Sequence, residues 1–428
     1  MRRLFSLWVV GWCSATLLAQ TPPSAPSPAA AGERDRPLSV LLISMDTTRA
    51  DHLGCYGHPA NPTPNIDAVA KQGALFEHCY SPAPITLPSH SSMFTSTLPF
   101  VHGVRDNGVY RLRPENLTIT EVLKQQGYAT AAVVGAFVLD RAFGLSQGFD
   151  EYDDVRRVDV GGTDRSRIRD ADEVTDRALA LLEKIGSQRF FLFVHYFDPH
   201  ERYEPPPRWA GKFDDPYLEE IAFVDEQIGR LLAGLEKAGL SDRTLVVITA
   251  DHGEGRGDHD ESTHGYFVYD STLRVPLILR APRGVPAGRR ISAQVRLIDL
   301  APTILELTGA GRLPQAQGAS FVSLLQGVVT GDVPRPSYGE SFFPRTYLKF
   351  SQLRSLRADG WKFIHADPPE LYHVVEDPGE TRNLASENVE RVKQMRSALR
   401  RMITDAPRIA AAEQASRQLS DEELRNLE

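Results

Sequence analysis

The chain has 428 residues, of which 41% are hydrophobic, so it can bury a large core and form more than one compact unit. Its formal net charge is -8, and no basic stripe runs along the sequence. A nucleic-acid partner therefore has no electrostatic support.

The first residues have the pattern of a secretory signal peptide, which we assign to residues 1–20. Two arginines precede an apolar run that ends in small residues. The run is short for a membrane span, and an uncleaved anchor is the second interpretation. Residues 21–36 are rich in Pro, Ala and Ser and predict a disordered linker. We therefore expect a periplasmic or secreted protein with no stable membrane span after signal cleavage.

Apolar runs alternate with helical patterns over residues 37–325. Strands buried on both faces of a sheet are predicted for 38–46, 129–137, 189–198, 243–251 and 274–282. Helical spacing covers 65–76, 120–128, 172–186 and 216–239, and a further helix is expected within 295–311. This alternation predicts an α/β catalytic domain with a mostly parallel sheet flanked by helices.

Residues 335–428 predict a C-terminal subdomain. Short strand-like pieces fall within 335–341, 353–366 and 370–378, and Asp359-Gly360 marks a tight turn between two of them. We expect a small antiparallel sheet, with Lys362 as one of its strand residues, followed by a helix from about Ser386.

Two cysteines, Cys55 and Cys79, remain after signal removal. They could form one bridge in an oxidising compartment or stay as two buried thiols.

Asp46 and Asp251 each end a predicted strand, at the edge of a sheet where α/β proteins place their sites. Asp46 alone could be a helix cap. The second strand ends in Asp251-His252 and opens a glycine-rich loop that also holds His259 and His264. Carboxylate and imidazole are ligands of Zn²⁺ and Mn²⁺, so this concentration of histidine favours a metal site.

Two further stretches carry reactive groups. In "VHYFDPHERY", His195, Asp198 and His200 follow another strand end, and His195 fits a buried core or supporting role. In "PITLPSH", Thr86 precedes a proline, a serine and His90 and lies at the entry to a helix. The pattern leaves open whether Thr86 is a nucleophile or a helix cap.

The order of these motifs carries a family resemblance. Asp46 after a strand is followed by "PITLPSH", "DPHERY" and "TADHGE", and then by "LIDLAPTILELTG" and "ELYHVVEDPGETRNLA". Together they resemble the sulfatase branch of the alkaline phosphatase superfamily over residues 37–385. The resemblance implies an alkaline-phosphatase-like fold and the hydrolysis of anionic esters.

The resemblance also implies site residues. It implies a divalent metal held by four side chains: Asp46, Thr86, Asp251 and His252. Thr86 falls at the position of the nucleophile. Asn107 and His200 fall where the family contacts the ester oxygens or the leaving group, and His264 falls where many sulfatases have a lysine.

Two departures from the family pattern bear on the chemistry. Sulfatases oxidise a Cys or Ser to formylglycine within a motif that ends in Arg, whereas this chain has Thr86 and His90. A threonine has a methyl group on Cβ and could give only a ketone, so no formylglycine is expected. The paired acids after the first strand become Asp46-Thr47, which removes one oxygen donor from a calcium-type cage.

We therefore predict an exported, metal-dependent hydrolase of sulfate or phosphate esters with a Thr86 nucleophile. The substrate would be a small-molecule, glycan or lipid anionic ester, and zinc or manganese is favoured over calcium. The spacing of His252 and His264 also resembles phosphoethanolamine transferases, so a transferase is one alternative. An inactive homologue that binds anionic glycans or lipids is another. A second metal near His200 and His264, completed by Asp198 or His259, is a further hypothesis.

Overall fold

A computed structural model describes residues 38–155, 168–329 and 334–407, and all three stretches belong to one compact unit. Residues 1–36, the predicted signal peptide and linker, lie outside the described residues. The predicted domain boundaries and the export of the protein stay predictions. Among the described residues, no helix is long and apolar enough to cross a membrane.

A nine-stranded sheet forms the centre of the fold, in the order β4-β3-β5-β1-β6-β7-β2-β8, with β9 paired to β2. Its strands are β1 Ser39–Met45, β2 Ala74–Tyr80, β3 Ala129–Val134, β4 Glu151–Asp153, β5 Phe190–Tyr196, β6 Thr244–Ala250, β7 Arg274–Arg280, β8 Arg289–Ile291 and β9 Val295–Arg296. The five strands from β4 to β6 run parallel, and β7 is antiparallel to both of its neighbours. The predicted mostly parallel α/β sheet is confirmed.

Strand β1 shows why continuous apolar runs form this sheet. Side chains alternate across a strand, and both faces of β1 are covered. Val40 and Leu42 join one buried cluster, whereas Leu41 and Ile43 join the other.

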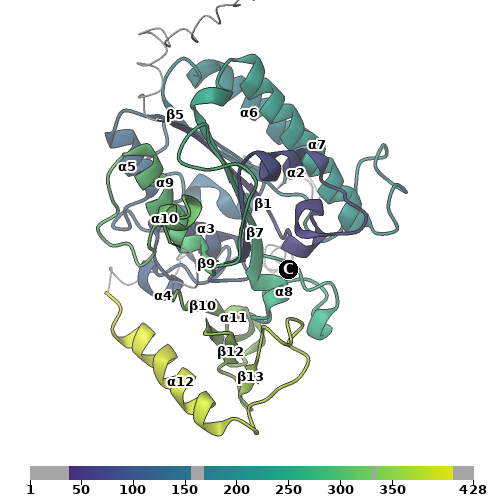
Figure 1. Cartoon of the computed structure of the whole chain (residues 1–428), viewed down its shortest axis with the longest axis vertical. Coiled ribbons are helices and arrows are strands. Elements are labelled where there is room, and N and C mark those ends of the chain that lie inside the picture. The colour runs from purple at the N-terminus through teal and green to yellow at the C-terminus, as the bar shows by residue number, and fades with distance from the viewer. Residues whose placement is uncertain (1–37, 156–167, 330–333, 408–428) are drawn as a thin grey trace, which may run out of the picture. The chain divides into compact units, whose positions relative to one another are not determined.

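Helices cover both faces of the sheet. The helices of the described residues are α2 Pro64–Gln72, α3 Thr86–Thr95, α4 Pro99–His102, α5 Ile119–Gln125, α6 Ala171–Ile185, α7 Pro216–Lys237, α8 Asp270–Leu273, α9 Leu300–Thr308, α10 Val322–Leu325, α11 Phe343–Leu348 and α12 Val389–Thr404. Figure 1 shows α6, α7 and α2 together on one side of the sheet, and α3, α5 and α9 on the other. The apolar faces of these helices fill the two clusters that flank β1.

One predicted element is wrong in part. The helix expected over 65–76 ends at Gln72, and β2 begins at Ala74. A side chain at Gly73 would lie 2.0 Å from the carbonyl oxygen of Leu279, so the chain passes there only as glycine. Helical spacing over 65–76 concealed this change of element.

The C-terminal residues form a second, antiparallel sheet, confirming the prediction. It contains β10 Ser337–Ser341, β11 Leu353–Ala358, β12 Trp361–Ile364 and β13 Glu370–Tyr372, in that order. Figure 1 shows α12, in yellow, alongside this sheet. Lys362 of β12 is buried and contacts Asp270 of α8 at 2.7 Å and Glu380 at 2.9 Å.

The two cysteines are free thiols rather than a bridge. Cys79 is buried, and Cys55 is half-buried. The alternative of two unpaired thiols is therefore confirmed, although only the Cys79 thiol is fully buried.

Candidate active site

Three neighbouring strands bring distant parts of the chain to one edge of the sheet. Strand β1 lies between β5 and β6 and runs parallel to both, so the carboxyl ends of all three meet. Ser44 of β1 stands beside His195 of β5 and Thr249 of β6. Asp46 and Asp251 follow directly after their strands and therefore lie close together.

The carboxylates of Asp46 and Asp251 are buried without the partners that buried acids normally have. Both are at most 1% exposed. Neither oxygen of Asp46 has a hydrogen-bond partner, and Oδ2 of Asp251 has none. Burial raises the pKa of each carboxyl above its ordinary value. Such a pair requires positive charge from another source.

His252 presents one nitrogen to these carboxylates. Its Nδ1 donates to the carbonyl oxygen of Gly253 at 2.9 Å, so the lone pair is on Nε2. Nε2 lies 3.5 Å from Asp46 Oδ1 and 3.5 Å from Asp251 Oδ2. Burial opposes protonation, but the two carboxylates raise the pKa of His252.

Thr86 lies at the first position of α3 and is not its N-cap, because Ile85 has that place. Its side chain is 2% exposed. The Oγ1 atom lies 3.4 Å from His252 Nε2, which is a long hydrogen bond. The cap interpretation of Thr86 is therefore wrong, and its hydroxyl lies next to the His252 nitrogen that also approaches both carboxylates.

The arrangement of these donors fits a metal ion. One ligand atom from each of Asp46, Asp251 and His252 can be chosen so that all lie within 4.8 Å of one another. His252 Nε2 lies 3.4 Å from Thr86 Oγ1 and 3.5 Å from one oxygen of each aspartate, and these distances are long for hydrogen bonds. They match the edge of about 3.3 Å expected when tetrahedral ligands lie about 2.0 to 2.1 Å from Zn²⁺.

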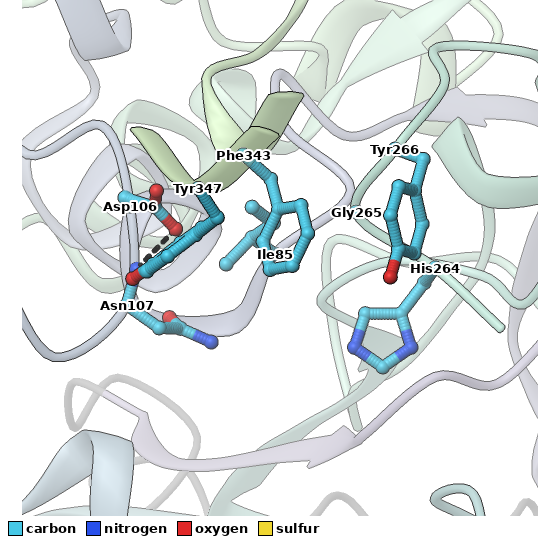
Figure 2. Close-up of a pocket in the computed structure, with 8 residues that line it drawn as sticks. All are labelled: Ile85, Asp106, Asn107, His264, Gly265, Tyr266, Phe343 and Tyr347. Atoms are coloured by element: carbon cyan, nitrogen blue, oxygen red, sulfur yellow. Dashed lines mark hydrogen bonds between the residues drawn. The ribbon is translucent and has the colours of Figure 1, made fainter. Parts of the chain in front are cut away.

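A pocket opens beside Thr86. It is lined by Ile85, which directly precedes Thr86, and by Asp106, Asn107, His264, Gly265, Tyr266, Phe343 and Tyr347. Figure 2 shows Asn107 and His264 on opposite sides of this space, with Ile85 and the ring of Phe343 between them. The Oδ1 atom of Asn107 accepts from the backbone N–H of Leu87 at 2.9 Å, so its amide N–H groups remain available to a ligand.

His264 and His200 lie next to the candidate metal ligand His252. The ring of His264 packs 4.6 Å from that of His252 and 5.0 Å from that of His200. Burial lowers the pKa of His264 well below its ordinary value and that of His200 to about 4. Both imidazoles are therefore neutral at neutral pH.

Glu254 is a residue of this site that sequence reasoning missed. Its Oε1 lies 3.2 Å from His264 Nδ1, and its Oε2 is buried without a hydrogen-bond partner. The signal was in the "DHGE" string, where an acid follows the Asp-His pair by two residues. Glu254 fixes Nδ1 of His264 as a donor and so leaves Nε2 to the pocket.

Several residues near the motifs lie elsewhere or act differently. Ser89 lies inside α3 and donates to the carbonyl oxygen of Asp251 at 2.7 Å. His259 stacks on Tyr269 with ring centroids 3.6 Å apart, away from the Asp251 and His252 ligands. The carboxyl of Asp198 is buried, which raises its pKa to about 7. Neither His259 nor Asp198 joins a ligand group with His200 and His264, so the structure does not support that second-metal hypothesis.

Thr47 shows what replaced the second acid of the family pattern. Its backbone has a φ of 49°, which is rare for a β-branched residue. Its hydroxyl donates to the carbonyl oxygen of Pro199 at 2.8 Å. Thr47 therefore ties the end of β1 to the loop that carries His200.

Comparisons with known proteins identify the family of the chain and agree with the fold. The chain matches the sulfatase family over residues 39–310 and the C-terminal part of N-sulphoglucosamine sulphohydrolase over residues 261–406. An N-acetylglucosamine-6-O-sulfatase of Bacteroides thetaiotaomicron is 25% identical, over 82% of this chain and 83% of the relative. The steryl-sulfatase of Mus musculus is 24% identical, over 88% of this chain and 83% of the relative.

Solved structures share the fold. A protein in complex with its substrate D-glucosamine-2-N,6-O-disulfate has a TM-score of 0.74 at 21% identity, covering 86% of this chain and 97% of that one. A phosphonate monoester hydrolase from Silicibacter pomeroyi has a TM-score of 0.73 at 23% identity, covering 89% and 100%. The family match spans more than half of the chain, and so this protein belongs to the sulfatase family, whose members are sulfuric ester hydrolases.

Proposed function

We propose that the protein is a metal-dependent hydrolase of sulfate or phosphate monoesters and that Thr86 is its nucleophile. The observation that carries the proposal is the position of Thr86 Oγ1, 3.4 Å from His252 Nε2, which itself lies 3.5 Å from the buried carboxylates of Asp46 and Asp251. A threonine hydroxyl needs activation before it can attack at neutral pH.

The residues that would hold the metal are Asp46, Thr86, Asp251 and His252. A divalent cation bound there would lower the pKa of the Thr86 hydroxyl and offset charge on the ester oxygens. The carbonyl of Gly253 keeps His252 in the tautomer that metal binding requires. The imidazole among these ligands favours zinc or manganese over calcium.

The chain itself supplies the remaining groups. Attack by Thr86 Oγ1 on phosphorus or sulfur forms a Thr86 ester and breaks the bond to the leaving oxygen. The amide of Asn107 would donate to a non-bridging oxygen of the ester. Nε2 of His264, which is unprotonated because Nδ1 carries the proton, would take up the proton of the Thr86 hydroxyl and pass it to the leaving oxygen. Water then releases phosphate or sulfate and restores the hydroxyl.

An anionic group is favoured beside Thr86 for a further reason. Thr86 begins the ten-residue helix α3, and a helix N-terminus attracts negative charge by about 0.3 to 1 kcal/mol. Three of the proteins compared above carry names that refer to sulfated glucosamine or steryl sulfate. Sulfated amino sugars are therefore the first natural esters to test, and the signal-like N-terminus supports an exported enzyme that would meet them outside the cytoplasm.

The test is a panel of 4-nitrophenyl sulfate, 4-nitrophenyl phosphate, bis-4-nitrophenyl phosphate and glucosamine 6-sulfate, each with Zn²⁺, Mn²⁺ or Ca²⁺. We expect turnover of at least one monoester and a loss of about 1,000-fold or more in Thr86→Ala. Thr86→Ser should retain much more activity. Thr95→Ala is the matched control, because Thr95 lies on the same helix and its hydroxyl donates to Ser91.

Full activity in Thr86→Ala would falsify the role of Thr86. Adding ethanolamine or glycerol as an acceptor separates hydrolysis from group transfer. A transferase would release less free phosphate and form the acceptor ester instead.

A further inference from the structure

Strand β10 of the small sheet contacts two of the segments that form the candidate active site. The backbone N–H of Glu340 donates to the carbonyl oxygen of Pro82 at 3.0 Å, in the segment that leads into α3. The hydroxyl of Ser341 donates to the carbonyl oxygen of Gly265, which directly follows His264. Both segments are therefore attached to β10.

A third contact of β10 is the ion pair between Glu340 and Arg105. Arg105 donates through Nε to Oε1 of Glu340 at 2.9 Å and through Nη2 to Oε2. The side chain of Glu340 is 1% exposed, and its Oε2 also accepts from the hydroxyl of Tyr338. The guanidinium of Arg105 lies 3.8 Å above the centre of the Phe342 ring. Two parallel hydrogen bonds and a stacked ring hold this guanidinium in one orientation.

Arg105 lies in a segment without regular secondary structure. Residues 103–109, between α4 and α5, belong to no helix or strand. Asn107 is in the same segment, two residues after Arg105. Because no ladder of backbone hydrogen bonds fixes such a segment, its side-chain contacts determine where it lies. The ion pair with Glu340 therefore controls the position of Asn107.

The position of Asn107 matters because its amide points in two directions. Its Oδ1 accepts from the backbone N–H of Leu87 at 2.9 Å, and Leu87 directly follows Thr86. Its N–H groups are left for an ester oxygen beside Thr86. A donor stabilises a transition state only when it lies about 2.7 to 3.1 Å from the developing charge. A displacement of about 1 Å can lower a rate by about 100-fold.

We propose that Glu340 is a positioning residue, which holds Arg105 and thereby presents the Asn107 amide to the ester oxygens. The inference rests on the function proposed above, because the amide needs an oxyanion to act on. Glu340 is not among the residues that line the pocket. The C-terminal residues would then complete the site, since α11, which follows β10, also supplies Phe343 and Tyr347 to the pocket (Figure 2).

A double-mutant cycle between Glu340 and Asn107 tests the proposal. The kcat on the best ester of the panel is measured for Glu340→Gln, Asn107→Ala and the double variant, all loaded with the same metal. We expect kcat to fall by about 100-fold in Glu340→Gln and by about 100- to 1,000-fold in Asn107→Ala. The double variant should be within about twofold of Asn107→Ala, because Glu340 acts through that amide.

The affinity for orthovanadate, measured by calorimetry, gives a second cycle that does not require turnover. Vanadate is an oxyanion, so both single variants should bind it more weakly than wild type. The double variant should bind it as weakly as Asn107→Ala. Glu370→Gln is the matched control, because Glu370 also lies in the small sheet and accepts from the hydroxyls of Tyr269 and Tyr372. It should keep the wild-type kcat and vanadate affinity.

A wild-type kcat in Glu340→Gln, or losses that multiply in the double variant, would overturn the positioning role and leave the role of Thr86 intact. If Glu340→Gln does not fold, Arg105→Lys takes its place, since it keeps the charge and loses the paired hydrogen bonds. The same two outcomes then overturn the proposal.

Failure of the proposed function has a different signature, which is a wild type that hydrolyses no ester. The vanadate cycle then decides the positioning role alone. A wild type that neither hydrolyses an ester nor binds vanadate would refute both proposals.

Discussion

The protein buries ionisable side chains in two places and balances their charge in different ways. Near the small sheet, Lys362 contacts Asp270 and Glu380, and Arg357 also contacts Asp270. At the edge of the large sheet, Asp46 and Asp251 face imidazoles alone in the described part of the chain.

The carboxyl pKa values differ accordingly. Burial opposes ionisation of Asp270, but Lys362 and Arg357 still lower its pKa below the usual range. Burial raises the pKa of Asp46 and Asp251 without such compensation. A buried acid with a cation in the chain is part of the fold, whereas a buried acid without one indicates a site that takes its cation from solution.

The largest expected change in the free energy of unfolding comes from removing the internal cation, Lys362. Lys362→Met leaves Glu380 without its partner and should lower the free energy of unfolding by about 3 to 5 kcal/mol. Urea denaturation in the presence of a chelator measures this loss of stability. Lys237→Met, at the exposed end of α7, is the control and should change stability by less than about 0.5 kcal/mol. Equal effects of the two changes would contradict the view that Lys362 balances a buried charge.

At the candidate metal ligands, the change in the free energy of unfolding is expected to have the opposite sign. Asp46→Asn removes a buried charge that has no partner, so the metal-free protein should become more stable by about 1 to 3 kcal/mol. Zinc affinity should fall by about 100-fold or more because a ligand is lost. Denaturation with and without zinc measures both changes. A metal-free Asp46→Asn that is less stable than wild type would show that the carboxylate is balanced within the chain.

As the pH falls, the buried imidazoles should lose their contribution to stability at a higher pH than Asp270 does. Burial lowers the pKa of His102 to about 3, so this ring is neutral in the folded state while the unfolded ring gains a proton below about pH 6.5. Its contribution to stability is present above pH 6.5 and is lost as pH falls towards the folded pKa. Between pH 7 and 5 the loss is about 2 kcal/mol for this ring. His102→Asn should therefore lose about 2 kcal/mol less than wild type over that range.

The smallest effect is expected where solvent screens the charges. Arg49 contacts Asp258 at 2.8 Å, and the side chain of Asp258 is 52% exposed. Asp258→Asn should change the free energy of unfolding by less than about 1 kcal/mol. Raising the salt concentration should reduce the difference further. A loss as large as that of Lys362→Met would remove the distinction between buried and exposed pairs.

Much of the fold could be predicted because buried parallel strands are apolar throughout. The runs at 38–46 and 243–251 match β1 and β6 within two residues. β2 was missed because its apolar start continues the spacing of α2, and the change depends on a contact of Gly73 with a distant strand. No local pattern reports such a contact.

Less of the candidate site than of the fold could be predicted from the sequence. Asp46, Thr86, Asp251 and His252 could be selected from motif order, and the structure brings their donors together. His195 was interpreted as a supporting residue because a lone histidine at a strand end usually finds a hydrogen-bond partner. Its unpartnered nitrogens depend on the packing of three strands and α3, which sequence does not give.

The position of β1 between β5 and β6 has a consequence for synthesis of the protein. Its neighbours in the sheet begin about 150 and 200 residues later in the chain, so the first strand leaves the ribosome long before either of them. At a synthesis rate of about 5 to 20 residues per second, about 10 to 40 seconds pass between the synthesis of β1 and that of β6. During that interval an apolar strand is without its partners, and a chaperone that shields Ser39–Met45 should raise the yield of the folded enzyme.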